Sequence, residues 1–243
     1  MADPRFFVDT ELVTGQVLDL PKSVAHHASH VLRLRDGDGV VLFDGRGGEF
    51  HGRLSTRGTQ AELTAHDPVE RESPIAATLI QAWIATDKLD WVVEKAVELG
   101  AVRIALTPAR RSVVRLDGAR LAKRLERLRD IVVAACCQCG RNRLPPIEAF
   151  IDLESALRRC GGADVAGFVL QPDAPGSLAD LARSAAGSFT VAVGPEGGFE
   201  DSELALAERA GYRPARLGAR VLRTETAGLA ALAALQATVG DYR

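Results

Sequence analysis

The order of apolar and polar residues along the chain changes near residue 72. Before that point, apolar residues alternate with polar ones over short runs, which is typical of strands with one buried face. A helical spacing interrupts them at residues 22–32, and the sequence DGRGG at residues 44–48 indicates a hairpin turn. Five short strands and one helix predict a small β-barrel over residues 1–72. The predicted strands are residues 5–8, 16–20, 40–43, 49–54 and 61–66.

After a polar stretch at residues 70–74 that ends in proline, strands and helices alternate. Asp87 is the expected cap of a helix whose apolar residues recur at helical spacing, and Gly100 ends that helix. This alternation predicts an α/β domain over residues 73–243, with a parallel sheet covered on both faces. The predicted strands are residues 78–85, 103–106, 165–170, 189–193 and 221–222, and the later helices are residues 117–139, 178–184, 200–210 and 226–239.

Composition is that of an ordinary globular protein, with 47% hydrophobic and 26% charged residues. No apolar stretch is long enough to span a bilayer, and the N-terminus lacks the features of a signal peptide. We therefore expect a cytoplasmic protein without a membrane partner. Cys136, Cys137 and Cys139 would be reduced there, and without a second Cys pair or a nearby histidine they suggest small buried helix residues rather than a zinc site.

The net charge of −2 hides a strong local bias. Residues 103–143 carry eleven Lys or Arg residues against three acidic ones, a local balance of +8. A solvated helix face normally mixes both signs, so this excess predicts a surface that binds a polyanion. All but one of these cations are arginine, whose planar fork fits phosphate groups.

Two glycine-containing segments carry the most specific chemistry. The first reads GPEGGF at residues 194–199, and the second reads LGARVLRTETA at residues 217–227; both are expected at the carboxyl ends of strands. Ligands of open α/β sheets bind at that edge, and glycines let the backbone approach a ligand closely. Neither segment has the Gly-Lys-Ser/Thr of a phosphate-binding loop, and residues 44–48 lack the last glycine of a dinucleotide fingerprint.

Together, the two segments resemble the ribosomal RNA small-subunit methyltransferase E (RsmE) family of the SPOUT superfamily. Residues 5–7 (RFF) and 30–38 (HVLRLRDGD) are similar to the family's PUA-like RNA-binding module, and residues 95–100 (KAVELG), 111–113 (RSV) and 138–141 (QCGR) are similar to its catalytic domain. The sequence departs from the family pattern at residues 84–86 (IAT), at Arg110 and at Ala219. None of these departures changes a glycine.

The resemblance implies a fold and an activity. The fold would be α/β: a knotted (trefoil) SPOUT methyltransferase domain with a parallel sheet, preceded by a small PUA-like β-barrel domain. The activity would be S-adenosylmethionine-dependent methylation of N3 of one uridine in small-subunit ribosomal RNA. We expect the assembled subunit as the substrate, with naked RNA as the open alternative, and we expect no metal because the sequence lacks a set of metal ligands. The resemblance also implies a homodimer, and the apolar surface nearly all round the last helix predicts the same.

Site residues follow from the same resemblance. Arg223 is the first candidate for a cation that stabilises charge on the uridine carbonyl oxygens, and Arg141 and Arg5 are the next ones. Glu225 would either orient Arg223 or accept the N3 proton; a structural ion pair between the two is the alternative. Cofactor contacts are expected at Leu170, Gly194, Pro195, Glu196, Gly197, Gly198, Leu217, Gly218, Val221, Leu222, Thr226 and Ala227. RNA contacts are expected at Arg5, Arg33, Arg35, Arg111, Arg120, Arg124 and Arg127.

Other interpretations stay open at this point. One is a non-catalytic RNA-binding or ribosome-assembly protein with the same fold. Another is a nucleotide-dependent or metal-dependent α/β enzyme, for which the sequence lacks the motifs. His26 and His30 lie one helical turn apart, but no third metal ligand accompanies them, so RNA contact or plain surface are the alternatives. Trp83 and Trp91 are expected in the core or at a domain interface.

Overall fold

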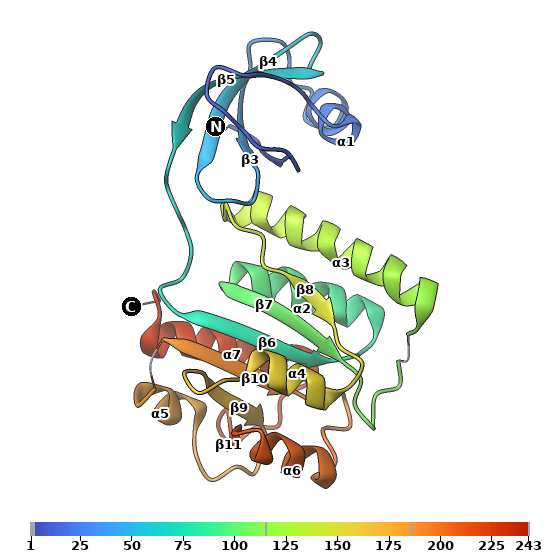
Figure 1. The fold of residues 1–243 in the computed structure, drawn as a ribbon, viewed down its shortest axis with the longest axis vertical. Helices are drawn as coiled ribbons and strands as arrows, with labels where there is room; N and C mark the ends of the chain where they lie inside the picture. The colour runs from blue at the N-terminus through green and yellow to red at the C-terminus, as the bar shows by residue number, and fades with distance from the viewer. Residues whose placement is uncertain (1–2, 115, 186, 243) are drawn as a thin grey trace. The chain divides into compact units, whose positions relative to one another are not determined.

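The computed structural model of the protein describes residues 3–114, 116–185 and 187–242 (Figure 1). It divides into two compact units. The first combines Met1–Glu72 with Cys136–Leu144, and the second combines Ser73–Ala135 with Pro145–Arg243. Within the described ranges, no helix has the length and apolar character needed to cross a membrane.

The first unit is built on a five-stranded sheet with the strand order β1-β3-β4-β5-β2. Strand β1 runs parallel to β3, and the other neighbours are antiparallel. Apolar side chains of β1, β3, β4 and β5 meet in one buried core, so the predicted small β domain is confirmed. The strands are β1 (Arg5–Phe7), β2 (Val17–Asp19), β3 (Gly39–Phe43), β4 (Glu49–Ser55) and β5 (Gln60–Asp67).

The single helix predicted over residues 22–32 is wrong in one respect. Helix α1 (Lys22–His26) continues into a π-helical turn, η1 (His27–Val31), in which the amide of Leu32 donates to the carbonyl of His27. Helical periodicity cannot distinguish this wider turn from an α-helix. Ala28 in this turn is fully buried, whereas Val31 and Leu32 at its end are exposed.

The second unit contains a six-stranded sheet with the order β11-β9-β10-β6-β7-β8, and every neighbouring pair is parallel. The predicted parallel α/β sheet is therefore confirmed. Parallel strands end at a common edge, so the loops that follow them meet there. The strands are β6 (Ala76–Ala82), β7 (Ala101–Thr107), β8 (Ile147–Ala149), β9 (Ala166–Leu170), β10 (Ser188–Val193) and β11 (Arg213–Ala215).

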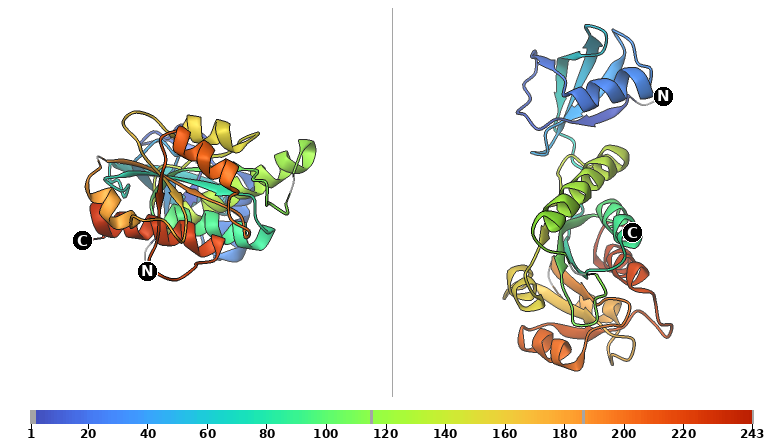
Figure 2. Two further views of the ribbon diagram at one scale, coloured as in Figure 1. Left: turned by 90° about the horizontal axis from the view of Figure 1, so that it is seen from below. Right: turned by 90° about the vertical axis from the view of Figure 1, so that its right-hand side faces the viewer.

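Helices cover both faces of this sheet (Figure 2). Helices α4 (Leu153–Cys160) and α6 (Asp201–Arg209) pack with the sheet in one apolar cluster. Helices α2 (Thr86–Glu98) and α7 (Thr224–Val239) lie against each other on the other face, and α5 (Leu178–Arg183) packs on α7. Helix α3 (Gly118–Cys139) is the longest described helix, and its last turn belongs to the first unit.

Several local predictions for the second unit are wrong. Val221 and Leu222 form no strand; they lie in the loop between β11 and α7, where Val221 is 79% exposed. Ala85, not Asp87, is the N-cap of α2, and Asp87 is an acidic residue of the first turn. Trp83 is buried, whereas Trp91 is 44% exposed on α2 and is not a core residue. Elements β8, α4 and β11 have no counterpart among the predicted ones.

Candidate functional site

A cavity of about 510 Å³ opens in the second unit, at the carboxyl ends of β9, β10 and β11. The last residue of each strand lines it: Leu170, Val193 and Ala215. The loops after these strands, residues 171–172, 194–199 and 217–223, form the walls together with the first turns of α2 and α7. The volume is in the range of cavities that hold small ligands and cofactors.

Loop 194–199 folds tightly on itself. The amide of Gly198 donates to the carbonyl of Pro195 at 2.9 Å, and Gly198 has a φ of 70°. A Cβ atom on Gly194 would lie 2.8 Å from the backbone nitrogen of Phe199, so only glycine fits there without moving the loop. The loop therefore presents backbone to the cavity, as the two glycine segments led us to expect.

A buried hydrogen-bond chain connects this loop to the sheet and to α7. Thr224, the first residue of α7, donates from its hydroxyl to the carbonyl of Gly194 at 2.6 Å. The side-chain amide of Gln81 on β6 donates to the same hydroxyl at 3.0 Å. Gln81 and Thr224 are both buried, and sequence reasoning found neither of them. The chain fixes the start of α7 against loop 194–199.

The charged groups of the cavity have an arrangement that differs from the predicted one. Glu225 lies at an ion-pair distance of 3.5 Å from Lys88, which also lies 3.6 Å from Glu196. The described residues therefore do not form the structural ion pair between Arg223 and Glu225 that was the alternative. Arg223 is exposed, lines the cavity and has no carboxylate within 4.0 Å among the residues described.

The structure brings most of the expected site residues together. All of the expected cofactor residues except Thr226, which is exposed on α7, line the cavity, as do Arg223 and Glu225. Arg141 lies instead in the first unit, is 4% exposed and donates to Glu72 at 2.5 Å. Its catalytic role stays a prediction. The lining residues outside the expected contacts are Lys88, Gln171, Pro172, Val193 and Ala215, together with Phe199, Arg220 and Thr224, which belong to the two glycine-containing segments but were given no role.

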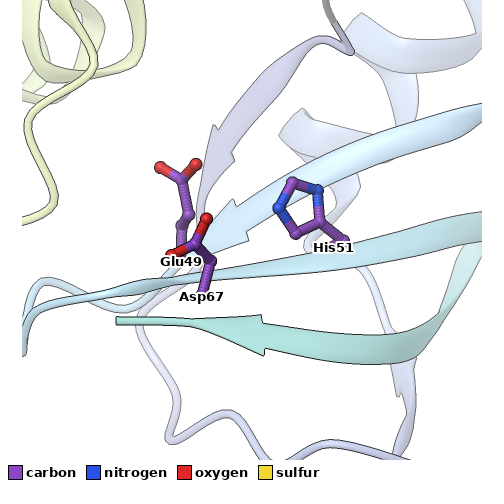
Figure 3. Close-up of side chains that lie close together, drawn as sticks. All are labelled: Glu49, His51 and Asp67. Carbon is purple, nitrogen blue, oxygen red and sulfur yellow. The ribbon is translucent and has the colours of Figure 1, made fainter. Parts of the chain in front are cut away.

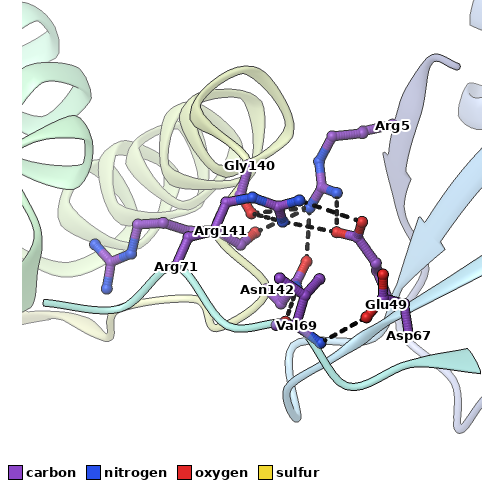
Figure 4. A network of polar contacts seen from close by, with 8 residues as sticks. All are labelled: Arg5, Glu49, Asp67, Val69, Arg71, Gly140, Arg141 and Asn142. Carbon is purple, nitrogen blue, oxygen red and sulfur yellow. Dashed lines mark hydrogen bonds and ion pairs between the residues drawn. The ribbon is translucent and has the colours of Figure 1, made fainter. Parts of the chain in front are cut away.

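Arg5, which was expected to contact RNA, takes part in a polar network within the first unit (Figure 4). Its guanidinium donates to Glu49 and, at 2.6 Å, to Asn142. Arg71 donates to Glu49 at 2.9 Å and to the carbonyl of Gly140 at 3.0 Å. Burial alone would raise the pKa of Glu49, but the two arginines outweigh it and hold that pKa at about 2. The network attaches residues 140–142 to the β domain.

Replacing Glu49 by glutamine should lower the free energy of unfolding of this unit by about 2 kcal/mol at pH 7, because an amide cannot balance two guanidinium groups. The pKa of Glu49 is depressed in the folded state from 4.5, so its contribution is complete above pH 4.5 and is lost as the pH falls toward 2. Denaturant unfolding of both proteins between pH 7 and pH 2.5 measures this. A difference that does not shrink with falling pH would contradict the assignment.

Glu49, His51 and Asp67 place three possible metal-ligand atoms within 4.8 Å of one another (Figure 3). Two arginines already bind the Glu49 carboxylate, and Asp67 accepts from the amide of Val69 at 3.0 Å. A cation would therefore compete with guanidinium groups that are fixed in place.

Cys136, on α3, is also a poor metal ligand, because burial raises the pKa of its thiol to about 12 and disfavours the thiolate.

The expected RNA contacts differ in their exposure and in their ion-pair partners. Arg33, Arg35 and Arg120 are exposed and lie in no described ion pair. Arg124 is different: its side chain is 9% exposed and donates to Asp90 at 2.6 Å and to the Thr86 carbonyl at 2.9 Å, which holds α3 against α2. The remaining two are Arg127, exposed but paired with Asp90, and Arg111, which donates to the Gly197 carbonyl.

Comparisons with known proteins agree with this architecture. Residues 71–236 match the RNA methyltransferase domain family, and residues 20–61 match the RNA methyltransferase PUA domain. The chain is 36% identical over 239 residues to the ribosomal RNA small subunit methyltransferase E of Mycobacterium tuberculosis, covering 95% of this chain and 90% of that protein. It is 29% identical to the Bacillus subtilis protein of the same name, covering 95% of each.

Solved structures give the same picture. The ribosomal RNA small subunit methyltransferase E of Neisseria gonorrhoeae, bound to S-adenosyl methionine, matches with a TM-score of 0.92 at 37% identity, over 100% of both chains. A Legionella pneumophila protein in complex with bound SAM matches with a TM-score of 0.91 at 32% identity, over 99% of this chain and 100% of that one. Both likenesses extend over the two units described above.

Proposed function

We propose, from the premise that this chain belongs to the ribosomal RNA small subunit methyltransferase E family, that it methylates N3 of one uridine in small-subunit ribosomal RNA with S-adenosylmethionine as donor. The observation that carries the proposal is the cavity at the ends of β9, β10 and β11, with its backbone-lined glycine loops. Two relatives with this fold hold the same cofactor.

The residues of the cavity fit S-adenosylmethionine. Leu170, Leu217 and Leu222 offer apolar contacts for an adenine ring, and loops 194–199 and 217–223 offer backbone amides and carbonyls for its polar edge. Glu196 and Glu225 place negative charge near a cationic ligand. We propose that these groups, with Gly194, Pro195, Gly197, Gly198, Gly218, Val221 and Ala227, form the cofactor site; Thr226, which does not line the cavity, is left out.

The chemistry needs a base and a cation. When bound, S-adenosylmethionine supplies a methyl group that its sulfonium has already activated. Uridine N3 carries a proton at neutral pH, so its lone pair becomes available only when that proton leaves. We propose that the Glu225 carboxylate accepts the proton and that Arg223 stabilises the negative charge on the neighbouring carbonyl oxygen. Arg141 stays a second candidate for that cation.

RNA binding is proposed along the exposed face of α3, with Arg111 and, from the first unit, Arg5, Arg33 and Arg35 as further contacts. Replacing Arg120 and Arg127 by alanine should weaken RNA binding and flatten its salt dependence by about two units, because two phosphate contacts are lost. Arg124 is left in place because it holds α3 against α2. Filter binding between 50 and 300 mM salt measures the slope.

The control for this experiment is the pair Arg158→Ala and Arg183→Ala, which removes two exposed arginines from α4 and α5. It should leave the slope unchanged. An equal change in both double variants would show that the loss reflects overall charge and would contradict a binding surface on α3.

We further propose a cytoplasmic homodimer. In α7, Ala230, Ala233 and Ala234 are only half-buried and Ala237 is exposed, so this apolar helix offers a surface for a second copy. A monomeric mass in light scattering at micromolar concentration would contradict it. The family resemblance also supports a trefoil knot, in which the chain after Val193 threads through an earlier loop.

The experiment that tests the function uses the purified protein, S-adenosylmethionine with a labelled methyl group, and either small ribosomal subunits or their naked RNA. We expect 3-methyluridine at one position after nuclease digestion and mass spectrometry, with the assembled subunit as the better substrate. Label on another nucleoside would contradict the uridine-N3 assignment. Binding of RNA without any heat from S-adenosylmethionine in calorimetry would support the non-catalytic alternative.

A further inference from the structure

Lys88 lies between two carboxylates at the cavity. Its ammonium is 3.5 Å from Oε1 of Glu225 and 3.6 Å from Oε1 of Glu196, and its side chain is 28% exposed. The three residues come from separate elements: the first turn of α2, the first turn of α7 and loop 194–199. Because α2 and α7 pack against each other, this contact is fixed by the fold of the domain.

The other oxygen of Glu225 has a different environment. Oε2 is inaccessible to solvent and has no hydrogen-bond partner, although the side chain lines the cavity. A buried carboxylate oxygen normally accepts hydrogen bonds, and leaving it without one is unfavourable. Lys88 is the single ion-pair partner of Glu225 among the described residues, so the carboxylate keeps the capacity to accept a further donor.

Lys88 itself is not suited to bind an anionic ligand. Its charge is already shared by two carboxylates, in contrast to Arg223, which has no ion-pair partner among the described residues. An ammonium between Glu196 and Glu225 instead attracts both carboxylates. It restrains the two side chains and offsets the repulsion between their negative charges. The effect of Lys88 on a reaction in the cavity is therefore exerted through Glu225.

We propose that Lys88 is a positioning residue that holds the Glu225 carboxylate at the cavity, where it accepts a proton from an N–H group of the substrate base. This inference rests on the proposed function and deepens it, because it names the chemical class that the site accepts. A uracil imide has an N3–H to donate, whereas cytosine N3 carries a lone pair that would face the carboxylate. The site then selects its base by the presence of that proton.

The test compares Lys88→Met, Lys88→Arg and Lys95→Met in the full-length protein. Lys95 is the matched control, because it lies on the same helix, also contacts two glutamates, Glu94 and Glu98, and does not line the cavity. Lys88→Met should lower the single-turnover rate of methyl transfer by about tenfold to a hundredfold. Lys88→Arg should recover most of that loss, and Lys95→Met should leave the rate unchanged.

Two further measurements separate positioning from other roles. The Kd for S-adenosylmethionine should change by less than about threefold in Lys88→Met, since the lost interaction acts on the base and not on the cofactor. In a protein that already carries Glu225→Gln, Lys88→Met should cause no further loss of rate. The effects of two substitutions are not additive when both residues act through the same group.

Three outcomes would overturn the inference. A Kd that rises in parallel with the loss of rate would make Lys88 a cofactor ligand, and full additivity with Glu225→Gln would mean that Lys88 acts independently. An unchanged rate in Lys88→Met, with normal transfer by the unaltered protein, would overturn the role of Lys88 and leave the proposed function in place. Absence of transfer by the unaltered protein would overturn the proposed function together with this inference.

Discussion

Replacing Glu225 by glutamine is expected to lower the rate of methyl transfer by at least about a hundredfold, the usual range for loss of a general base. The amide has nearly the same shape as the carboxylate, but its oxygen cannot take a proton from uridine N3. The contact between Oε1 and Lys88 would weaken, while the backbone that lines the cavity would be unaffected. Single-turnover transfer to small ribosomal subunits measures the rate, and calorimetry with S-adenosylmethionine measures the affinity.

The matched control is Glu98→Gln, which makes the same change at the carboxylate that accepts from Lys95 on α2, away from the cavity. Its rate should be that of the unaltered protein. If Glu225→Gln loses cofactor affinity and rate to the same extent, Glu225 is a cofactor ligand and a different group takes the proton.

Replacing Gly198 by valine is expected to reduce S-adenosylmethionine affinity by at least about a hundredfold, close to abolition. Gly198 has a φ of 70°, a conformation that a β-branched residue avoids, so the turn from Pro195 to Gly198 must rearrange. The space beside a Cβ atom at this position is open. The loss would therefore come from the backbone conformation of the loop and not from a clash with another described residue of the protein.

Gly211 provides the control for that variant. It has a φ of 87°, open space beside its Cβ position and no contact with the cavity. Gly211→Val should therefore cost about the same stability, roughly 1–2 kcal/mol, without changing cofactor affinity. Thermal unfolding and calorimetry of the two variants separate the effects. Equal affinity in both would mean that loop 194–199 does not bind the cofactor.

Most of the α/β domain could be predicted because the apolar residues of each main element recur at the spacing of a helix or of a strand. In α2, for example, Leu89, Val92, Val93 and Ala96 recur at helical spacing and are all buried. The missed strands β8 and β11 are three residues long, and β11 contains Pro214, which a central strand would exclude. Val221 and Leu222 have strand propensity, but no partner strand lies beside them.

The candidate site could be predicted only as far as it is continuous in sequence. The two glycine segments were found because each one is a short run after a strand. Lys88 was missed because only tertiary packing places it beside Glu225. Arg124 shows the opposite case. The sequence of a long basic helix does not indicate which arginine forms an ion pair within the protein, and here Arg124 pairs with Asp90 on α2.

The hydrogen-bond chain from Gln81 through Thr224 to Gly194 also affects how the protein is made. It requires β6, near the start of the second unit, and α7, at its end. While the ribosome is still synthesising the chain, the cavity cannot form until α7 has left the exit tunnel. Pairing of such distant strands and helices is slow, and the unfinished sheet is prone to aggregation in that interval. Cofactor binding therefore begins only after α7 has left the exit tunnel.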